Sequence, residues 1–214
     1  MIYSLNEIDA MGKRAARGAG LDWGFAEEAG KAIRWLSANN LPGAEALCEV
    51  LTLNEGKTYE ELVPTSVDGT WVASSGTLCP IITGAALSDR AHRIASGQNI
   101  KLAKIIKPLL LLPYLANVAK QTGITVEITW QGTQVTVCTR GISIKGDDLE
   151  IGLVDEVKCH RADFEENVTS GGVVGRAVNR EAWDSLTAFM TRYLAPNTEE
   201  SRIAGAGSSG NDGD

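Results

Sequence analysis

The sequence is poor in the residues that most often carry catalysis and metal binding. It has only two histidines and four cysteines among its 214 residues. The cysteines show neither C-x-x-C spacing nor a short-loop framework; they are Cys48, Cys79, Cys138 and Cys159. This spacing is typical of reduced thiols in a cytoplasmic protein rather than of a zinc site or a disulfide scaffold. We therefore predict no metal site, no cofactor and no disulfide.

Long hydrophobic runs and an excess of basic residues are also lacking. The most apolar stretch, residues 100–119, contains three lysines and two prolines, whereas a membrane span needs about 20 mostly apolar residues. The first residues lead directly into polar ones, so no signal peptide is predicted. Lys and Arg number 20 against 27 Asp and Glu, which gives a formal net charge of −7. We expect a cytoplasmic protein with neither nucleic acid nor a membrane as its partner.

The first third of the chain is patterned as helices. Ser4 and Glu7 have the spacing of a capping box, which predicts a helix that ends near Gly18. Asp22 is placed to cap a second helix that runs to about residue 38. Both helices are rich in Ala and Gly on their apolar sides, which predicts a closely packed pair. A third helix is expected over residues 42–53.

The middle of the chain gives weaker signals. Residues 54–78 look irregular apart from a short strand near Trp71, and Pro80 begins a helix that is expected to reach about residue 96. Residues 104–112 fit either a buried strand or part of a kinked helix. We favour a strand there, followed by a helix from Pro113 to about residue 122.

Strict alternation of apolar and polar residues appears at residue 124. It predicts an antiparallel hairpin over residues 124–139 that turns at Gln131-Gly132. Five aliphatic side chains are expected to face the core: Ile124, Val126, Ile128, Val135 and Val137. Further strands are predicted in three stretches: residues 149–154, 157–163 and 173–178. The links between them are too short for parallel crossovers, so antiparallel order is expected.

A final helix is predicted from about residue 180 to 194. Helices gather early in the chain and strands later, which indicates an α+β fold rather than alternating α/β. The predicted organisation has three parts: a helical subdomain over 1–56, an α+β core over 57–200 and a Gly-rich tail over 201–214.

Cys79 is the strongest candidate for a reactive residue. It precedes Pro80 at a predicted helix N-terminus, where the helix dipole favours a thiolate, although a buried and inert cysteine is the commoner case. His92 would lie about 18 Å farther along the same helix, whereas a catalytic pair needs roughly 3 Å. Only His160 is then left as a catalytic partner. It neighbours Cys159 in a predicted strand, so the two should face opposite sides.

The Gly-rich tail has the composition of a disordered segment. Ordering it would need anchors, because its small side chains bury little apolar surface. We expect Arg202 and Asp212 to serve as charged anchors and Ile203 as an apolar one. Arg17 is a further candidate for anchoring the tail or a ligand.

Short motifs throughout the chain resemble a small bacterial family of unknown function. They include Ser4-Leu5-Asn6-Glu7-Ile8, Ala26-Glu27-Glu28-Ala29-Gly30, Trp71 with Cys79-Pro80, and the leucine run from Pro108 to Pro113. None of these motifs is a catalytic signature. The resemblance implies a bacterial and cytoplasmic origin, but no activity, ligand or site.

Three classes of function remain open. The protein is a small-molecule enzyme that uses Cys79, a non-catalytic binding or regulatory protein, or a homo-oligomeric structural protein whose tail crosses between subunits. The sequence does not decide whether the chain is an enzyme. We favour a metabolic protein that binds a small molecule, with an unidentified reaction.

Overall fold

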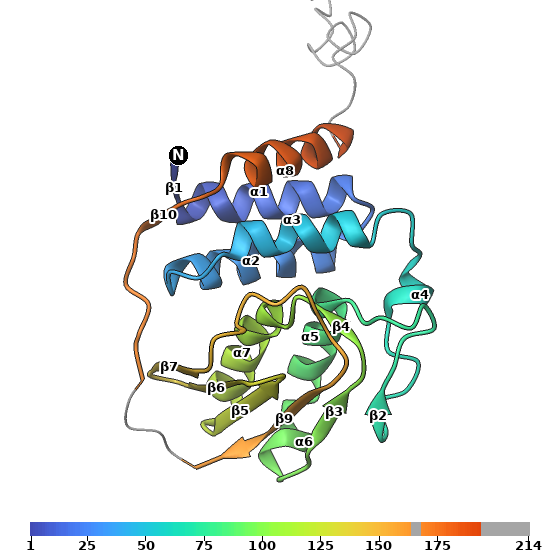
Figure 1. Cartoon of the computed structure of the whole chain (residues 1–214), viewed down its shortest axis with the longest axis vertical. Helices are drawn as coiled ribbons and strands as arrows, with labels where there is room; N and C mark the ends of the chain where they lie inside the picture. Colours follow the sequence, from blue (N-terminus) through green and yellow to red (C-terminus); the bar gives the residue numbers. More distant parts are fainter. Residues whose placement is uncertain (164–167, 194–214) are drawn as a thin grey trace, which may run out of the picture.

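The structure of the protein is a computed structural model that describes residues 1–163 and 168–193. Its fold is α+β, as predicted, and Figure 1 shows a helical layer above a layer that contains the main sheet. The helical layer contains α1 (Leu5–Gly18), α2 (Trp23–Ala38), α3 (Gly43–Leu53) and α8 (Arg180–Tyr193). Shorter helices follow α3: α4 (Tyr59–Leu62), α5 (Pro80–Asp89), α6 (Ala91–Ala95), the 3-10 helix η1 (Pro108–Leu111) and α7 (Leu112–Thr122).

The main sheet of the described chain is mixed. Its strands run in the order β2 (Thr70–Trp71), β3 (Ile100–Leu102), β9 (Val157–Ala162), β5 (Thr125–Trp130), β6 (Thr133–Cys138) and β7 (Gly141–Lys145). Neighbouring strands are antiparallel except β2 and β3, which are parallel. The prediction of antiparallel order concerned the strands after residue 124, and β2 and β3 lie outside it. Helices α5 and α6 lie between these two strands and provide the crossover that parallel pairing needs.

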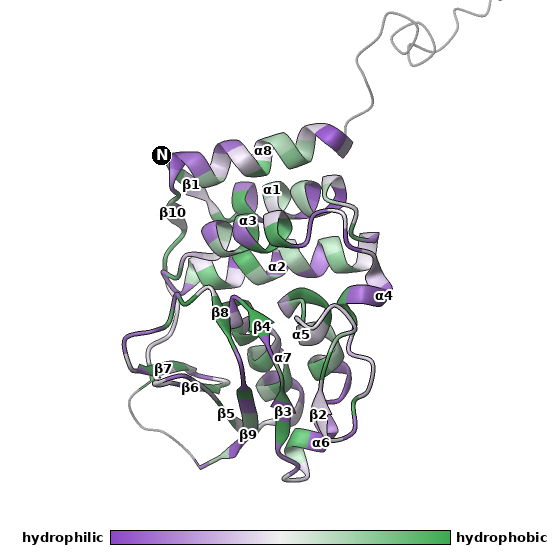
Figure 2. Ribbon diagram, turned by 45° about the vertical axis from the view of Figure 1, so that its right-hand side comes forward, coloured by the Kyte–Doolittle hydropathy of each residue, from purple (hydrophilic) through white to green (hydrophobic). Residues whose placement is uncertain are grey.

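Two short ladders lie outside the main sheet. They pair β1 (Ile2–Ser4) with β10 (Gly175–Ala177), and β4 (Ile105–Ile106) with β8 (Leu153–Val154). The strand predicted over residues 104–112 is thus reduced to the two residues of β4. The leucines that follow have no exposed surface; they are Leu109, Leu110, Leu111 and Leu112. Hydrophobic residues, green in Figure 2, concentrate where β4 and β8 approach the helical layer.

Helices α1 and α2 form the closely packed pair that the sequence predicts. The capping box of α1 is present, since the Glu7 N–H donates to Ser4 Oγ and the Ser4 N–H donates to Glu7 Oε2. Gly30 of α2 approaches the backbone of α1 so closely that a Cβ atom there would lie 2.7 Å from the Asp9 carbonyl oxygen. Gly18 makes a similar approach to α8, against the carbonyl group of Phe189.

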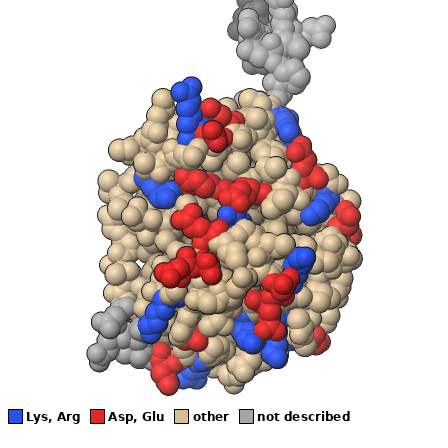
Figure 3. Space-filling view, viewed as in Figure 1, with Lys and Arg blue, Asp and Glu red and all other residues tan. Residues whose placement is uncertain are grey.

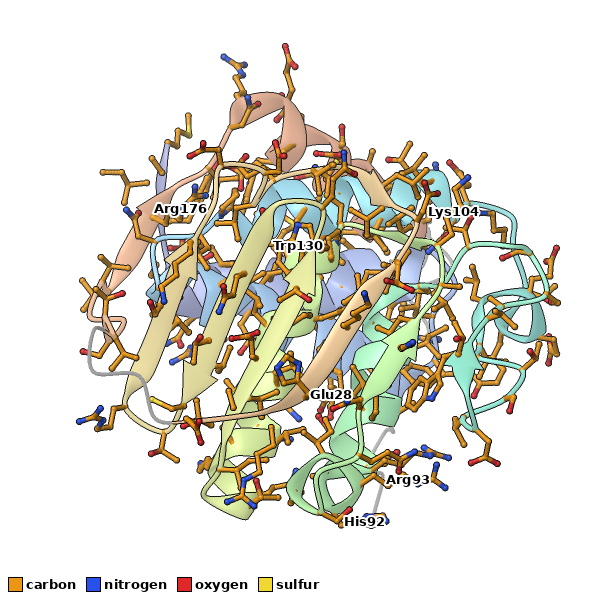
Figure 4. The ribbon with its side chains drawn as sticks, turned by 60° about the horizontal axis from the view of Figure 1, so that its bottom comes forward. Glu28, His92, Arg93, Lys104, Trp130 and Arg176 are labelled. Carbon is orange, nitrogen blue, oxygen red and sulfur yellow. The ribbon has the colours of Figure 1, made fainter. Side chains whose placement is uncertain are left out.

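The hairpin of β5 and β6 is confirmed. Val126, Ile128, Val135 and Val137 are buried in the core, and Ile124, which precedes the first residue of β5, is partly buried and packs against it. Helix α7 packs against both strands. Figure 4 looks onto the opposite face of the sheet, with the helices behind it. Polar residues of the alternating pattern lie on this outer face.

One further difference concerns the length of a helix. The helix predicted from Pro80 to about residue 96 is divided at Arg90 into α5 and α6. Among the described residues, no helix combines the length and the apolar character that crossing a bilayer requires.

Candidate functional site

A small pocket lies where several segments of the helical part of the chain meet. The turn between α1 and α2, the C-terminal end of α3, helix α4 and the first turn of α5 all contribute to its walls. The lining residues are Ala19, Gly20, Leu21, Asp22, Phe25, Leu51, Asn54, Lys57, Tyr59, Leu62 and Ile82. Its volume is about 150 Å³, which is about that of an engineered apolar cavity that binds benzene. We call it the Asn54 pocket.

Local backbone signals bring these segments together. Gly20 has a left-handed φ of 97°, which lets the chain reverse direction between α1 and α2. Asn54 follows the last residue of α3, and Gly56 makes a second left-handed turn. Thr58 and Glu61 then form a capping box that begins α4. This capping box lies inside the stretch expected to be irregular, and its spacing could have revealed the helix.

A chain of polar contacts runs beneath the pocket. The Lys57 ammonium donates to Asn54 Oδ1 at 3.3 Å, and the Asn54 side chain is largely buried. The Asn54 side chain and the backbone at the start of α5 also act on the buried Cys79 thiol, whose pKa they lower. Asn54 therefore lies between a charged lysine and a buried thiol.

The predicted position of Cys79 is confirmed, but its surroundings argue against a catalytic role. Cys79 is the N-cap residue of α5, with Pro80 at the next position. Only 1% of the residue is exposed. Burial raises the pKa of its thiol and outweighs the hydrogen bonds and the Lys57 charge, which act in the opposite direction. A protonated and inaccessible sulfur cannot attack a bound substrate. The catalytic role proposed for Cys79 is therefore withdrawn.

His160 lies elsewhere, in β9 of the main sheet, on the face opposite to that of the buried Cys159. Its Nε2 atom is 3.4 Å from Glu127 Oε1 across the β5–β9 ladder, and Gln134 Nε2 donates to the other oxygen of Glu127. The neighbouring Cys159 has no exposed surface and faces the core, as the alternation predicts. Cys79 and His160 therefore have different partners on different elements. Glu127 was missed because only the strand register reveals that it faces His160.

The mouth of the Asn54 pocket carries aromatic and charged side chains. Phe25 and Tyr59 stack with their ring centroids 5.6 Å apart, and Tyr59 is 46% exposed. Asp22 is the N-cap residue of α2, yet its exposed carboxylate makes no hydrogen bond to the helix. Lys57 lies across from this turn, on the segment between α3 and α4. The pocket thus combines an apolar interior with one carboxylate and one ammonium group.

Arg17 supports the wall of the pocket from behind. Its guanidinium donates to the Leu21 carbonyl oxygen and lies 5.0 Å from the centroid of the Trp23 ring. It also lies 5.8 Å from the ring of Tyr193, at the end of α8. Arg17 therefore holds the turn between α1 and α2 against α8. The other two predicted anchors, Arg202 and Asp212, lie outside the described residues, as does Ile203.

Charges elsewhere on the described surface are mixed. On the face drawn in Figure 3, acidic side chains form a band over α3, and basic ones are interleaved with acidic ones. Within residues 1–163 and 168–193, no group of three or more His, Cys, Asp or Glu side chains could hold a metal ion. All four cysteines are free.

The sequence comparison finds a similarity to one family over the first part of the chain. Residues 3–79 match the model of a family described as "Protein of unknown function (DUF3726)". This match confirms the resemblance to an uncharacterised family over those residues. The matched range contains every residue that lines the Asn54 pocket except Ile82. No curated protein matches the sequence.

Among solved structures, malate dehydrogenase from Entamoeba histolytica is similar to this chain, with a TM-score of 0.49 and 10% sequence identity. The similar region covers 68% of this chain and 49% of that enzyme. This chain thus spans about half the length of the dehydrogenase. At this level of similarity the likeness carries no argument about function.

Proposed function

We propose that the protein binds a small molecule in the Asn54 pocket. The observation that supports this proposal is the composition of the pocket. Leu51, Leu62 and Ile82 provide a buried apolar interior, whereas the polar groups of Asn54 and Lys57 converge on one side. Apolar pockets with a few converging polar groups are the usual form of ligand sites.

The size of the pocket limits both the ligand and its affinity. A volume of about 150 Å³ accommodates a molecule of about the size of benzene. The best small ligands gain at most about 1.5 kcal/mol per non-hydrogen atom, so a ligand of about six such atoms has a dissociation constant no lower than roughly 0.3 µM. Binding should therefore be measured at micromolar to millimolar ligand concentrations.

Thermal unfolding in the presence of benzene tests whether the pocket accepts a ligand. Benzene binding to the folded state raises the melting temperature by mass action. Ala19, the C-cap residue of α1, lines the pocket with right-handed backbone angles (φ −83°, ψ −1°) that any L-residue adopts, so Ala19→Leu fills the cavity without backbone strain. Ala188→Leu makes the same change on an exposed position of α8 and is the matched control.

We expect benzene to raise the melting temperature of the natural chain and of Ala188→Leu, and to leave that of Ala19→Leu unchanged. An equal response of Ala19→Leu and the natural chain would place the binding elsewhere. No response of the natural chain at millimolar benzene would refute a ligand pocket at this position.

A further inference from the structure

We infer that the natural ligand of the Asn54 pocket is an α-amino acid with an apolar side chain. This inference rests on the proposed function and adds the chemical class of the ligand. It follows from three groups around the pocket: an ammonium, a carboxylate and an apolar interior. An α-amino acid carries the complementary carboxylate, ammonium and side chain.

Lys57 and Asn54 form the subsite for the ligand carboxylate. An ammonium group has three N–H donors, and Lys57 uses one of them on Asn54 Oδ1 in a long hydrogen bond of 3.3 Å. Because Asn54 is largely buried, this hydrogen bond holds the Lys57 ammonium against the wall of the pocket. Two donors remain for an anionic group that enters the pocket.

Asp22 forms the subsite for the ligand ammonium. Its carboxylate is exposed and does not cap the helix that it precedes. An N-cap aspartate usually accepts a hydrogen bond from a backbone N–H group in the first turn of the helix. Asp22 accepts none, so both of its carboxylate oxygens remain available as acceptors. Asp22 and Lys57 come from different walls, the α1–α2 turn and the α3–α4 segment. Neither forms an ion pair with any other described residue.

The apolar interior accommodates the ligand side chain. Phe25, Leu62 and Ile82 line it together with Leu21, and its volume of about 150 Å³ suits a branched aliphatic or phenyl group. Asp22 and Lys57 are both exposed. A simple carboxylate pairs with Lys57 and leaves Asp22 to water, and a simple amine pairs with Asp22 and leaves Lys57 to water. A zwitterion pairs with both charges.

Isothermal titration calorimetry with three related probes tests this inference on the full chain. The probes are L-leucine, 4-methylpentanoate, which lacks the ammonium, and 3-methylbutylamine, which lacks the carboxylate. We expect L-leucine to bind at least tenfold more tightly than either analogue. Asp22→Asn should reduce the preference for leucine over the acid, and Lys57→Met the preference for leucine over the amine. Asp147→Asn and Lys120→Met, which lie outside the pocket, serve as charge-matched controls and should bind as the natural chain does.

The outcomes separate this inference from the proposed function. If benzene binds and L-leucine does not, the pocket is real and the amino-acid inference is wrong. If 4-methylpentanoate binds as tightly as leucine, the ligand is a simple carboxylate and the role of Asp22 is refuted. If leucine binds equally well to Ala19→Leu, it occupies another site, and the inference fails while the benzene result still decides the proposed function.

Discussion

The contact between α1 and α2 provides a sharp test of the helical layer. Gly30 lies in the middle of α2, where an added Cβ atom would lie 2.7 Å from the Asp9 carbonyl oxygen of α1, whereas ordinary contacts begin at 3.4 Å. Gly30→Ala therefore requires the two backbones to separate by about 0.7 Å. Gly24 lies near the start of the same helix, and a Cβ atom there would meet nothing within 4 Å. Gly24→Ala is thus the matched control.

The two substitutions are expected to change stability in opposite directions. Overpacking lowers the free energy of unfolding by about 1–3 kcal/mol, and rigid backbone contacts lie at the upper end of this range. Replacing Gly by Ala in a helix raises the free energy of unfolding by up to about 1 kcal/mol. Gly30→Ala should therefore lower the free energy of unfolding by about 1–2 kcal/mol and the melting temperature by about 2–8 °C. Gly24→Ala should raise the melting temperature by up to about 4 °C.

Circular dichroism of thermal and urea unfolding measures both variants against the natural chain. The urea dependence should keep its slope, because neither change alters the surface exposed on unfolding. If Gly30→Ala is as stable as Gly24→Ala, the helices are not in backbone contact at Gly30, and the close packing of α1 and α2 is refuted.

Three further predictions follow from buried side chains. Burial raises the pKa of the Cys159 thiol from 9.0 to about 12. Between those two pH values the unfolded chain has lost this proton and the folded chain keeps it. The free energy of unfolding should therefore fall with rising pH, by about 1.4 kcal/mol per pH unit. Urea titrations at several pH values should show a smaller fall for Cys159→Ala than for the natural chain. Alkylation followed by mass mapping should label the partly exposed Cys138 before the buried Cys79, and faster labelling of Cys79 would contradict its burial. Lys107 is buried, with Nζ 2.8 Å from Glu49 Oε1 and 3.0 Å from a backbone carbonyl oxygen. Lys107→Met should lower the free energy of unfolding, measured with urea, by about 1–3 kcal/mol. An unchanged midpoint of urea unfolding would show that these contacts contribute nothing to stability.

Signals that act within a few residues were sufficient to predict some of the regular elements. The capping box at Ser4 and the alternation around Gln131-Gly132 depend only on nearby residues, and both features are present as predicted. Strand β1 was missed because its partner β10 lies at the other end of the described chain. Strand β7 was missed because it offers only Ile142 and Ile144 as apolar residues, and its pairing with β6 provides the rest.

The site could not be predicted in the same way, because its residues become neighbours only through packing. Cys79 was correctly placed at a helix N-terminus, but its reactivity depends on whether water reaches the sulfur, which local sequence does not specify. Lys107 shows the reverse case. A lysine in a left-handed conformation within an apolar stretch suggests exposure, yet its ammonium is buried against α3.

The hydrogen bond between Lys57 and Asn54 restricts how a ligand can occupy the Asn54 pocket. The Lys57 ammonium donates to Oδ1 of the largely buried Asn54 at 3.3 Å. A ligand carboxylate that accepts from the two remaining donors of Lys57 leaves this hydrogen bond in place. A carboxylate that draws Lys57 away leaves the buried Asn54 oxygen without a partner, which costs free energy. The binding mode inferred for a zwitterion, with its carboxylate at Lys57 and its ammonium at Asp22, is of the first kind and is therefore the favoured one.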